Sequence, residues 1–169
     1  MSVASITETS QYLTFELEEE VFALDIAKVR EVLDFTAVTK VPQTPEFMLG
    51  VINLRGSVVP VVDMRLKFGM SRTETTVNTC IIIVEIEIDG ETTVLGALAD
   101  SVQEVMDLDP DQIEPPPRIG TRLNTKFIKG MGKRDSEFII ILDIDKLFSV
   151  DELAMANDMS EEPLQANVG

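Results

Sequence analysis

The chain has 169 residues, a length that suits one domain or two small subdomains. Its 30 acidic and 14 basic residues give a net charge of −16, which opposes binding to the phosphates of nucleic acids and to anionic membranes. It has no histidine, the commonest general base, and its single cysteine, Cys80, allows no internal disulfide.

The sequence contains no predicted signal peptide or membrane span. The N-terminal segment has neither a basic start nor an apolar core. Apolar runs such as 80–84 and 138–142 are five residues long, far shorter than a span requires. We therefore expect a cytoplasmic protein without direct membrane insertion.

The first part of the chain is predicted to form short strands. Strands are expected at 12–17 and 21–26, joined by a turn of three glutamates, followed by one helical turn at 26–29. A longer extended run should follow at 31–41. A helix over 25–33 is the alternative, because the apolar residues there also have helical spacing.

A compact unit follows at 45–68. Thr44 is expected to cap a short helix that begins at Pro45 and ends at Gly50. Strands at 51–54 and 58–62 should then flank a tight turn with Arg55 at its tip, exposed to a partner. Asp63 is expected to cap one more helical turn, closed by Gly69.

The second part of the chain repeats this alternation of strands and turns. Asp89-Gly90 is a strong hairpin signal, and Asp100 is expected to cap a short turn. The predicted strands are 79–88, 92–99, 104–108 and 138–144, with a proline-rich loop at 109–117 and a C-terminal helix at 146–155.

Two stretches of sequence recur at constant spacing. The unit at 45–68 matches 124–148 at an offset of 80, and residues 21–34 match 94–107 at an offset of 73. The repeats predict two similar subdomains, about 12–72 and 79–149, with a polar linker at 71–78 between them. Together they should form a single domain, 12–149, with flexible termini at 1–11 and 156–169.

The strand pattern predicts an all-β protein in which each half closes into a small barrel and so removes exposed sheet edges. The residues argue against catalysis. Cys80 has no histidine to activate it, and Asp107, Asp109 and Asp111 lack the glycine and the glutamate of a calcium loop. We expect binding rather than catalysis, and no cofactor or metal.

Two motifs resemble the CheW family of bacterial chemotaxis proteins: the run from Gly50 through Asn53-Leu54-Arg55-Gly56 to Asp63, and residues 23–32. The resemblance extends in order from about Tyr12 to Phe148. It implies two intertwined five-stranded SH3-like β-barrels with short helical turns and a C-terminal helix. It also implies a non-catalytic adaptor that joins the histidine kinase CheA to the cytoplasmic tip of methyl-accepting chemotaxis proteins in signalling arrays.

The resemblance also implies binding residues. Contacts to receptor and kinase are expected at Val29, Glu31, Asn53, Arg55 and Gly56, with a groove between the barrels lined by Val84, Val102 and Val105. Val38, Val41 and Pro42 are expected to contact the kinase. Two alternatives remain: a CheW-like adaptor of another chemosensory pathway, such as twitching or gliding motility, and an enzyme that uses surface carboxylates.

Overall fold

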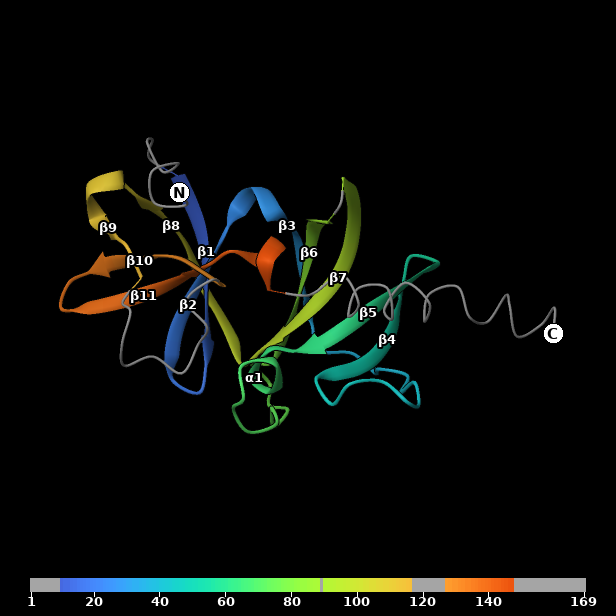
Figure 1. Ribbon diagram of the computed structural model, residues 1–169. Coiled ribbons are helices and arrows are strands. Elements are labelled where there is room, and N and C mark those ends of the chain that lie inside the picture. Colours follow the sequence, from blue (N-terminus) through green and yellow to red (C-terminus); the bar gives the residue numbers. More distant parts are fainter. Residues whose placement is uncertain (1–9, 89, 117–126, 148–169) are drawn as a thin grey trace.

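The computed structural model describes residues 10–88, 90–116 and 127–147, and strands dominate these ranges (Figure 1). One sheet has the order β8-β1-β2-β11-β10-β9 and the other β3-β6-β7-β5-β4. The first sheet contains β1 (Ser10–Leu17), β2 (Glu20–Asp25), β8 (Ser101–Leu108), β9 (Ile113–Glu114), β10 (Ile128–Arg134) and β11 (Glu137–Leu142). The second contains β3 (Val29–Asp34), β4 (Met48–Leu54), β5 (Ser57–Asp63), β6 (Cys80–Ile88) and β7 (Glu91–Ala99).

Each sheet closes on itself. In the second sheet, the chain beyond β3 returns to β4 through an isolated bridge between Thr39 and Val51. In the first, β9 follows β8 and pairs with β10. We call the two closed sheets the first barrel and the second barrel. The prediction of an all-β fold with two intertwined barrels is confirmed.

Within the described ranges, helical structure is confined to short turns. The helix α1 (Met64–Lys67) follows β5, and 3₁₀ turns occupy Ile26–Lys28, Pro110–Gln112 and Ile144–Lys146. As predicted, Asp63 caps α1, because its carboxylate accepts a hydrogen bond from the Arg65 backbone N–H at 3.0 Å. No helix within the described ranges is long and apolar enough to cross a membrane.

The barrels exchange hairpins. The β1–β2 hairpin joins β8, β10 and β11, whereas the β6–β7 hairpin joins β3, β4 and β5. Only three residues link β2 to β3, and Asp100 alone links β7 to β8. Connections this short have no room for a further strand, so the chain passes directly from each hairpin to a strand that pairs elsewhere, β3 with β6 and β8 with β1. The third strand therefore enters the other barrel.

Strand registers repeat at the offset of 80. Met48 pairs with Val62 and Ile128 with Leu142, and each ladder then shifts at a glycine, Gly50 or Gly130. A backbone hydrogen bond repeats as well. The Asp63 N–H donates to the Phe47 carbonyl oxygen at 2.7 Å, and the Asp143 N–H donates to the Phe127 carbonyl oxygen at 2.8 Å. The matching residues in sequence thus occupy matching places in the two barrels.

The largest buried cluster lies between the barrels and draws on both sheets. It includes Phe15 and Phe22 from the first barrel and Met64, Phe68 and Ile82 from the second. Each barrel also has a smaller interior cluster of its own. This shared core, as we call it, joins the two barrels through buried apolar area, which is the main stabilising term in a fold of this size.

Some local predictions are wrong. No helix forms at Pro45; the chain makes a turn there, and β4 has already begun at Met48. Gly50 lies inside β4 at φ +150° rather than ending a helix. A Cβ at this position would lie 2.1 Å from the Thr39 carbonyl oxygen, so the glycine permits the barrel to close.

Other predictions need smaller corrections. The alternative helix over 25–33 is wrong, since β3 occupies most of that range, and the extended run predicted to reach 41 ends as a strand at Asp34. Asp100 is not a helix cap. Most of the predicted C-terminal helix at 146–155, and Asp89 of the predicted turn, lie outside the described residues.

Candidate docking site

Arg55 lies at the tip of the β4–β5 hairpin, as the sequence predicts. Arg55 and Gly56 form the two-residue turn, with φ values of +51° and +88°. The Asn53 side-chain oxygen accepts a hydrogen bond from the Gly56 N–H at 2.8 Å and holds this conformation. The Arg55 side chain remains 69% exposed, so its guanidinium is accessible to a partner.

Arg55 and Glu31 form a bidentate ion pair across the second barrel. The two terminal guanidinium nitrogens of Arg55 each donate to one Glu31 carboxylate oxygen, both at 2.7 Å. Glu31 comes from β3 and Arg55 from the β4–β5 turn, so the pair fixes the direction of the guanidinium. Two planar groups matched in this way form one of the stronger surface contacts available to proteins.

The ion pair makes a testable prediction about protonation. Its hydrogen bonds hold the pKa of the Glu31 carboxyl below its ordinary value. Because folding lowers the pKa of Glu31, the ion pair stabilises the folded chain fully at pH values above the pKa of Glu31 in the unfolded chain. This stabilisation is lost as the pH falls through the pKa of Glu31 in the folded chain. In an NMR titration, we expect the Glu31 carboxyl of an Arg55→Gln variant to titrate at higher pH than in the unmodified chain. Identical titration curves would mean that the pair does not form in solution.

A cleft of about 750 Å³ adjoins this pair. It forms because β5 pairs with β7 only from Val61 to Asp63, so the preceding parts of the two strands lie apart. Its lining includes Glu31, Arg55, Val58, Pro60 and Thr92. The structure thus places Arg55 and Glu31 together at the rim of a hollow large enough for several side chains of a partner.

The predicted valine groove is only partly present. Val84 is wholly buried in the shared core, so the prediction that it lines an accessible groove is wrong. Val29 pairs with it in the sheet, and both Val29 and Val102 are half-buried against the same core. Val105 is 47% exposed.

The residues predicted to meet the kinase differ in exposure. Val38 is half-buried against the interior cluster of the second barrel, and Val41 is half-buried against the shared core. Pro42 is exposed.

Exposed apolar side chains form a pattern that sequence reasoning missed. Val32 and Val105 are 40% and 47% exposed and lie 73 residues apart, whereas Val58 and Phe138 are 43% and 51% exposed and lie 80 apart. They occupy corresponding strands of the two barrels. The offsets of the internal repeat could have shown that these positions correspond to one another. They could not have shown that the side chains are exposed.

The first barrel has an ion pair like that of Arg55 and Glu31. Glu104 lies 73 residues after Glu31, and its carboxylate contacts the Arg134 guanidinium at 2.8 Å. Arg134 lies at the end of β10, next to the tip of the β10–β11 hairpin. Both barrels therefore present a Glu–Arg pair together with exposed apolar residues on corresponding strands.

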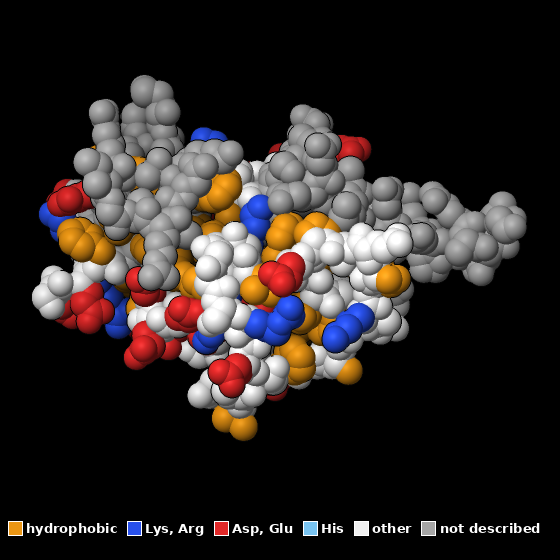
Figure 2. Space-filling view, turned by 60° about the horizontal axis from the view of Figure 1, so that its bottom comes forward, with side chains coloured by type: hydrophobic (Ala, Val, Ile, Leu, Met, Phe, Trp, Pro, Cys, Tyr) orange, Lys and Arg blue, Asp and Glu red, His pale blue; other side chains and the backbone are white. Residues whose placement is uncertain are grey.

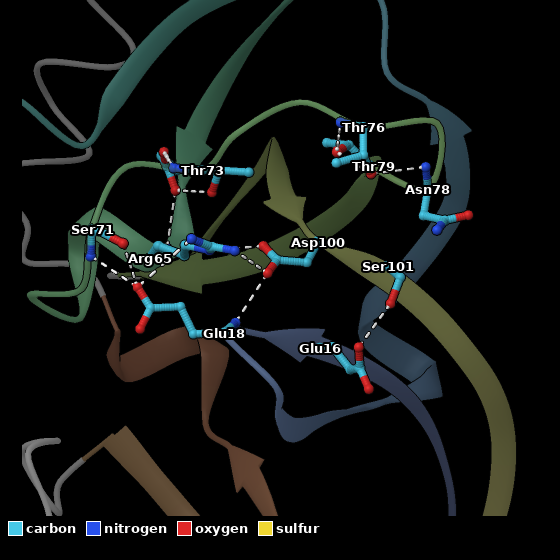
Figure 3. Close-up of polar contacts among 11 residues, drawn as sticks. Glu16, Glu18, Arg65, Ser71, Thr73, Thr76, Asn78, Thr79, Asp100 and Ser101 are labelled. Atoms are coloured by element: carbon cyan, nitrogen blue, oxygen red, sulfur yellow. Dashed lines mark hydrogen bonds and ion pairs between the residues drawn. The ribbon is translucent and has the colours of Figure 1, made fainter.

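A second network of charges ties the barrels together (Figure 3). Arg65 of α1 lies between Asp100 and Glu18, which is at the tip of the β1–β2 hairpin. Its Nε donates to Asp100 at 2.9 Å, and Asp100 also accepts from the Glu18 backbone N–H at 3.0 Å. The Glu18 carboxylate accepts from the Ser71 hydroxyl at 2.6 Å. The network fastens the hairpin of the first barrel to α1 of the second.

The corresponding position in the other half has the opposite charge. Asp145, 80 residues after Arg65, contacts Lys28 at 2.6 Å and accepts from the Glu87 backbone N–H at 2.9 Å. Lys28 and Asp100 lie in the two segments that connect the barrels. Each connection between the barrels is thus held by one ion pair.

Replacing Arg65 with alanine should lower the free energy of unfolding by about 1–3 kcal/mol, because Asp100 is then left partly buried without its cation. Urea unfolding followed by circular dichroism measures this loss. Arg30→Ala is the matched control: Arg30 pairs with Glu85, but the two side chains are 53% and 41% exposed, so little change is expected. Equal effects of the two substitutions would contradict the role given to Arg65.

The described ranges contain no group of three or more carboxylate, thiol or imidazole side chains placed to hold a metal ion. Cys80 is half-buried, and burial raises the pKa of its thiol, which disfavours the reactive thiolate.

Comparisons with known proteins agree on one family. A family model described as the CheW-like domain matches residues 11–152. The chain is 34% identical to the chemotaxis protein CheW of Klebsiella aerogenes, over 94% of this chain and 93% of the relative. It is 31% identical to the chemotaxis protein CheW of Thermotoga maritima, over 86% of this chain and 92% of the relative. The crystal structure of the scaffolding protein TtCheW from Thermoanaerobacter tengcongensis has a TM-score of 0.75 at 40% identity, covering 85% of this chain and 90% of that chain.

Proposed function

Because this chain belongs to the CheW family of chemotaxis proteins, we propose that it is a non-catalytic adaptor that couples methyl-accepting chemotaxis receptors to the histidine kinase CheA. It works in the cytoplasm, next to the membrane-bound receptors, as a single domain spanning 12–149. The observation that carries this proposal is the exposed Arg55–Glu31 pair at the rim of the cleft. A guanidinium held in a fixed direction is suited to recognise a carboxylate on a partner.

Two further features support an adaptor. The barrels present similar arrangements of exposed apolar residues, Val32 and Val58 on one and Val105 and Phe138 on the other. Burying such residues against a partner contributes roughly 25 cal/mol per Å², before the costs of association are subtracted. A rigid body with two such surfaces can bind two partners at once and hold them in a fixed relation.

The proposed contacts combine charge and apolar area. Arg55 donates to Glu31 with one hydrogen from each terminal nitrogen, which leaves other guanidinium donors free for a partner carboxylate. We assign Asn53 and Gly56 to holding the turn, and Val29, Val102 and Val105 to the surface that receives the receptor. Val38, Val41 and Pro42 are the proposed contacts to the kinase.

Arg55→Glu should leave the fold intact and weaken the ternary complex with receptor fragments and CheA by about tenfold or more, because a well-placed interface arginine is commonly a hot spot. Kinase stimulation in reconstituted receptor arrays measures the effect. Unchanged stimulation would rule out Arg55 as a docking residue.

A charge-swapped variant separates docking from internal stability. Glu31→Arg combined with Arg55→Glu keeps an ion pair within the second barrel but reverses both charges presented to a partner. We expect this double variant to remain impaired. If it restores coupling, then the pair acts only by stabilising the barrel, and the docking assignment fails.

A further inference from the structure

A shallow groove of about 220 Å³ lies where the segment between β3 and β4 meets the chain after α1. Apolar atoms of Val41, Pro45, Met48 and Leu49 line it, together with Lys40 and Arg72. The face that carries α1 is turned toward the viewer in Figure 2, where Lys and Arg side chains lie beside exposed apolar ones. The groove therefore combines apolar lining with two cations.

The two cations of the groove have no ion-pair partner in the part of the chain that the structure describes. Lys40 and Arg72 are both exposed and form no ion pair with the described residues, whereas Lys28, Arg30, Arg55, Arg65, Lys133, Arg134 and Lys146 all do. Glu46 also lines the groove but lies beyond ion-pair distance of both. On a chain of net charge −16, this groove is a site where an acidic segment would gain favourable electrostatic contacts.

The chain itself carries a segment of matching composition. Residues 151–162 contain five carboxylates and no lysine or arginine. Leu153, Met155 and Met159 lie between these charges and supply apolar groups for the lining of the groove. Both the charge and the apolar content of the segment are therefore complementary to the groove.

The segment starts within reach. Leu147, the last described residue, belongs to the same buried cluster as Met48, which lines the groove. An extended chain advances about 3.3 Å per residue, so residues 148–162 can span on the order of 50 Å. A contact too weak to form between separate molecules becomes populated when a tether holds the effective concentration of the segment at the groove at roughly millimolar.

We propose that residues 151–162 dock in the groove formed by Lys40 and Arg72. The carboxylates pair with the two cations, and the leucine and methionines lie on the apolar lining. The docked segment competes with any acidic segment of another protein for the same two cations. Salt weakens the contact, because exposed charges are screened within about 8 Å at physiological ionic strength.

Paramagnetic relaxation enhancement in the full chain tests this proposal. A nitroxide is attached at Ser160→Cys in a Cys80→Ser background. We expect selective broadening of the backbone amides of residue 72 and of residues 40–49 other than the two prolines, with loss of most of it at high salt. Lys40→Gln with Arg72→Gln should abolish the broadening. Lys129→Gln is the control, because Lys129 also forms no ion pair with the described residues but lies outside the groove, and it should leave the broadening unchanged.

Several results would overturn the proposal. They are the absence of broadening at the groove, broadening of equal strength on other faces, and broadening that survives Lys40→Gln with Arg72→Gln. A mixture of ¹⁵N-labelled chain without nitroxide and unlabelled chain with it identifies contacts between molecules. Broadening in that mixture would assign the groove to a second copy and would likewise contradict docking within one chain.

Discussion

Replacing Phe22 with alanine should lower the free energy of unfolding by about 3–5 kcal/mol, the range for removing a large aromatic side chain from a packed core. Phe22 is wholly buried in the shared core. Its ring stacks on Phe15 of its own barrel and on Phe68 of the other, with ring centroids 5.9 and 5.6 Å apart. The substitution therefore removes contacts on both sides of the boundary between the barrels.

Urea unfolding monitored by NMR at residues of both barrels measures this effect. Because the core is shared, we expect both barrels to lose stability together in one transition. Val77→Ala, at a side chain that is 97% exposed, serves as the control and should change stability little. Two separate transitions, with only the first barrel destabilised, would show that the cluster does not couple the barrels.

Gly50→Ala should have an effect of similar size, roughly 2–6 kcal/mol, from unfavourable backbone conformation and steric overlap combined. The new Cβ would overlap a backbone oxygen, that of Thr39, and backbone atoms cannot move aside as a flexible side chain can. The overlap falls at the bridge between Thr39 and Val51 that closes the second barrel. The variant is expected to open this seam before it unfolds globally.

Hydrogen exchange at the Thr39 and Val51 amides detects that opening, because the two residues donate to each other's carbonyl oxygens at 2.8 and 2.9 Å. Gly69→Ala is the control. Gly69 also has a positive φ, +78°, but apart from its neighbours in the chain no atom lies within 4 Å of a Cβ placed there. Only the conformational cost, about 1 kcal/mol, should appear in that control. Equal losses in the two variants would refute the steric argument.

The sequence was sufficient for features that depend on local patterns. Alternating strands, the Arg55 turn and the Asp63 cap follow from residue types within a few positions of one another. The repeat offsets of 80 and 73 were also visible, and the strand registers of the β4–β5 and β10–β11 hairpins repeat at the offset of 80. Such features need no knowledge of what lies across the fold.

Features set by long-range contacts were not predictable. In the sequence, Gly50 resembles a glycine that ends a helix, but its role is decided by Thr39, which approaches it from the segment between β3 and β4. Val84 was expected in a groove through the family resemblance, and only the packing of the two barrels shows that it is wholly buried. Asp100 resembles a helix cap, and only the fold brings it to Arg65.

In the candidate site, too, single residues were predictable from the sequence, whereas the contacts between them were not. The sequence indicated Arg55 and Glu31 separately, through a family resemblance. Their bidentate contact depends on β3 and the β4–β5 hairpin meeting in one barrel. The second Glu–Arg pair, of Glu104 and Arg134, was missed because Arg134 is one position away from the counterpart of Arg55 in the repeat.

The exchange of hairpins affects the order in which a nascent chain can fold on the ribosome. All strands of the second barrel are available once Ala99 has been made, whereas β2 must wait for its partner β11, which ends at Leu142. At translation rates of about 5–20 residues per second, that delay is on the order of 10 s. During this interval β1 can pair with β8 and the shared core can form, but Ala23 of β2 still lacks Ile139 and Ile141 of β11, so the interior of the first barrel stays open until the end of the chain arrives.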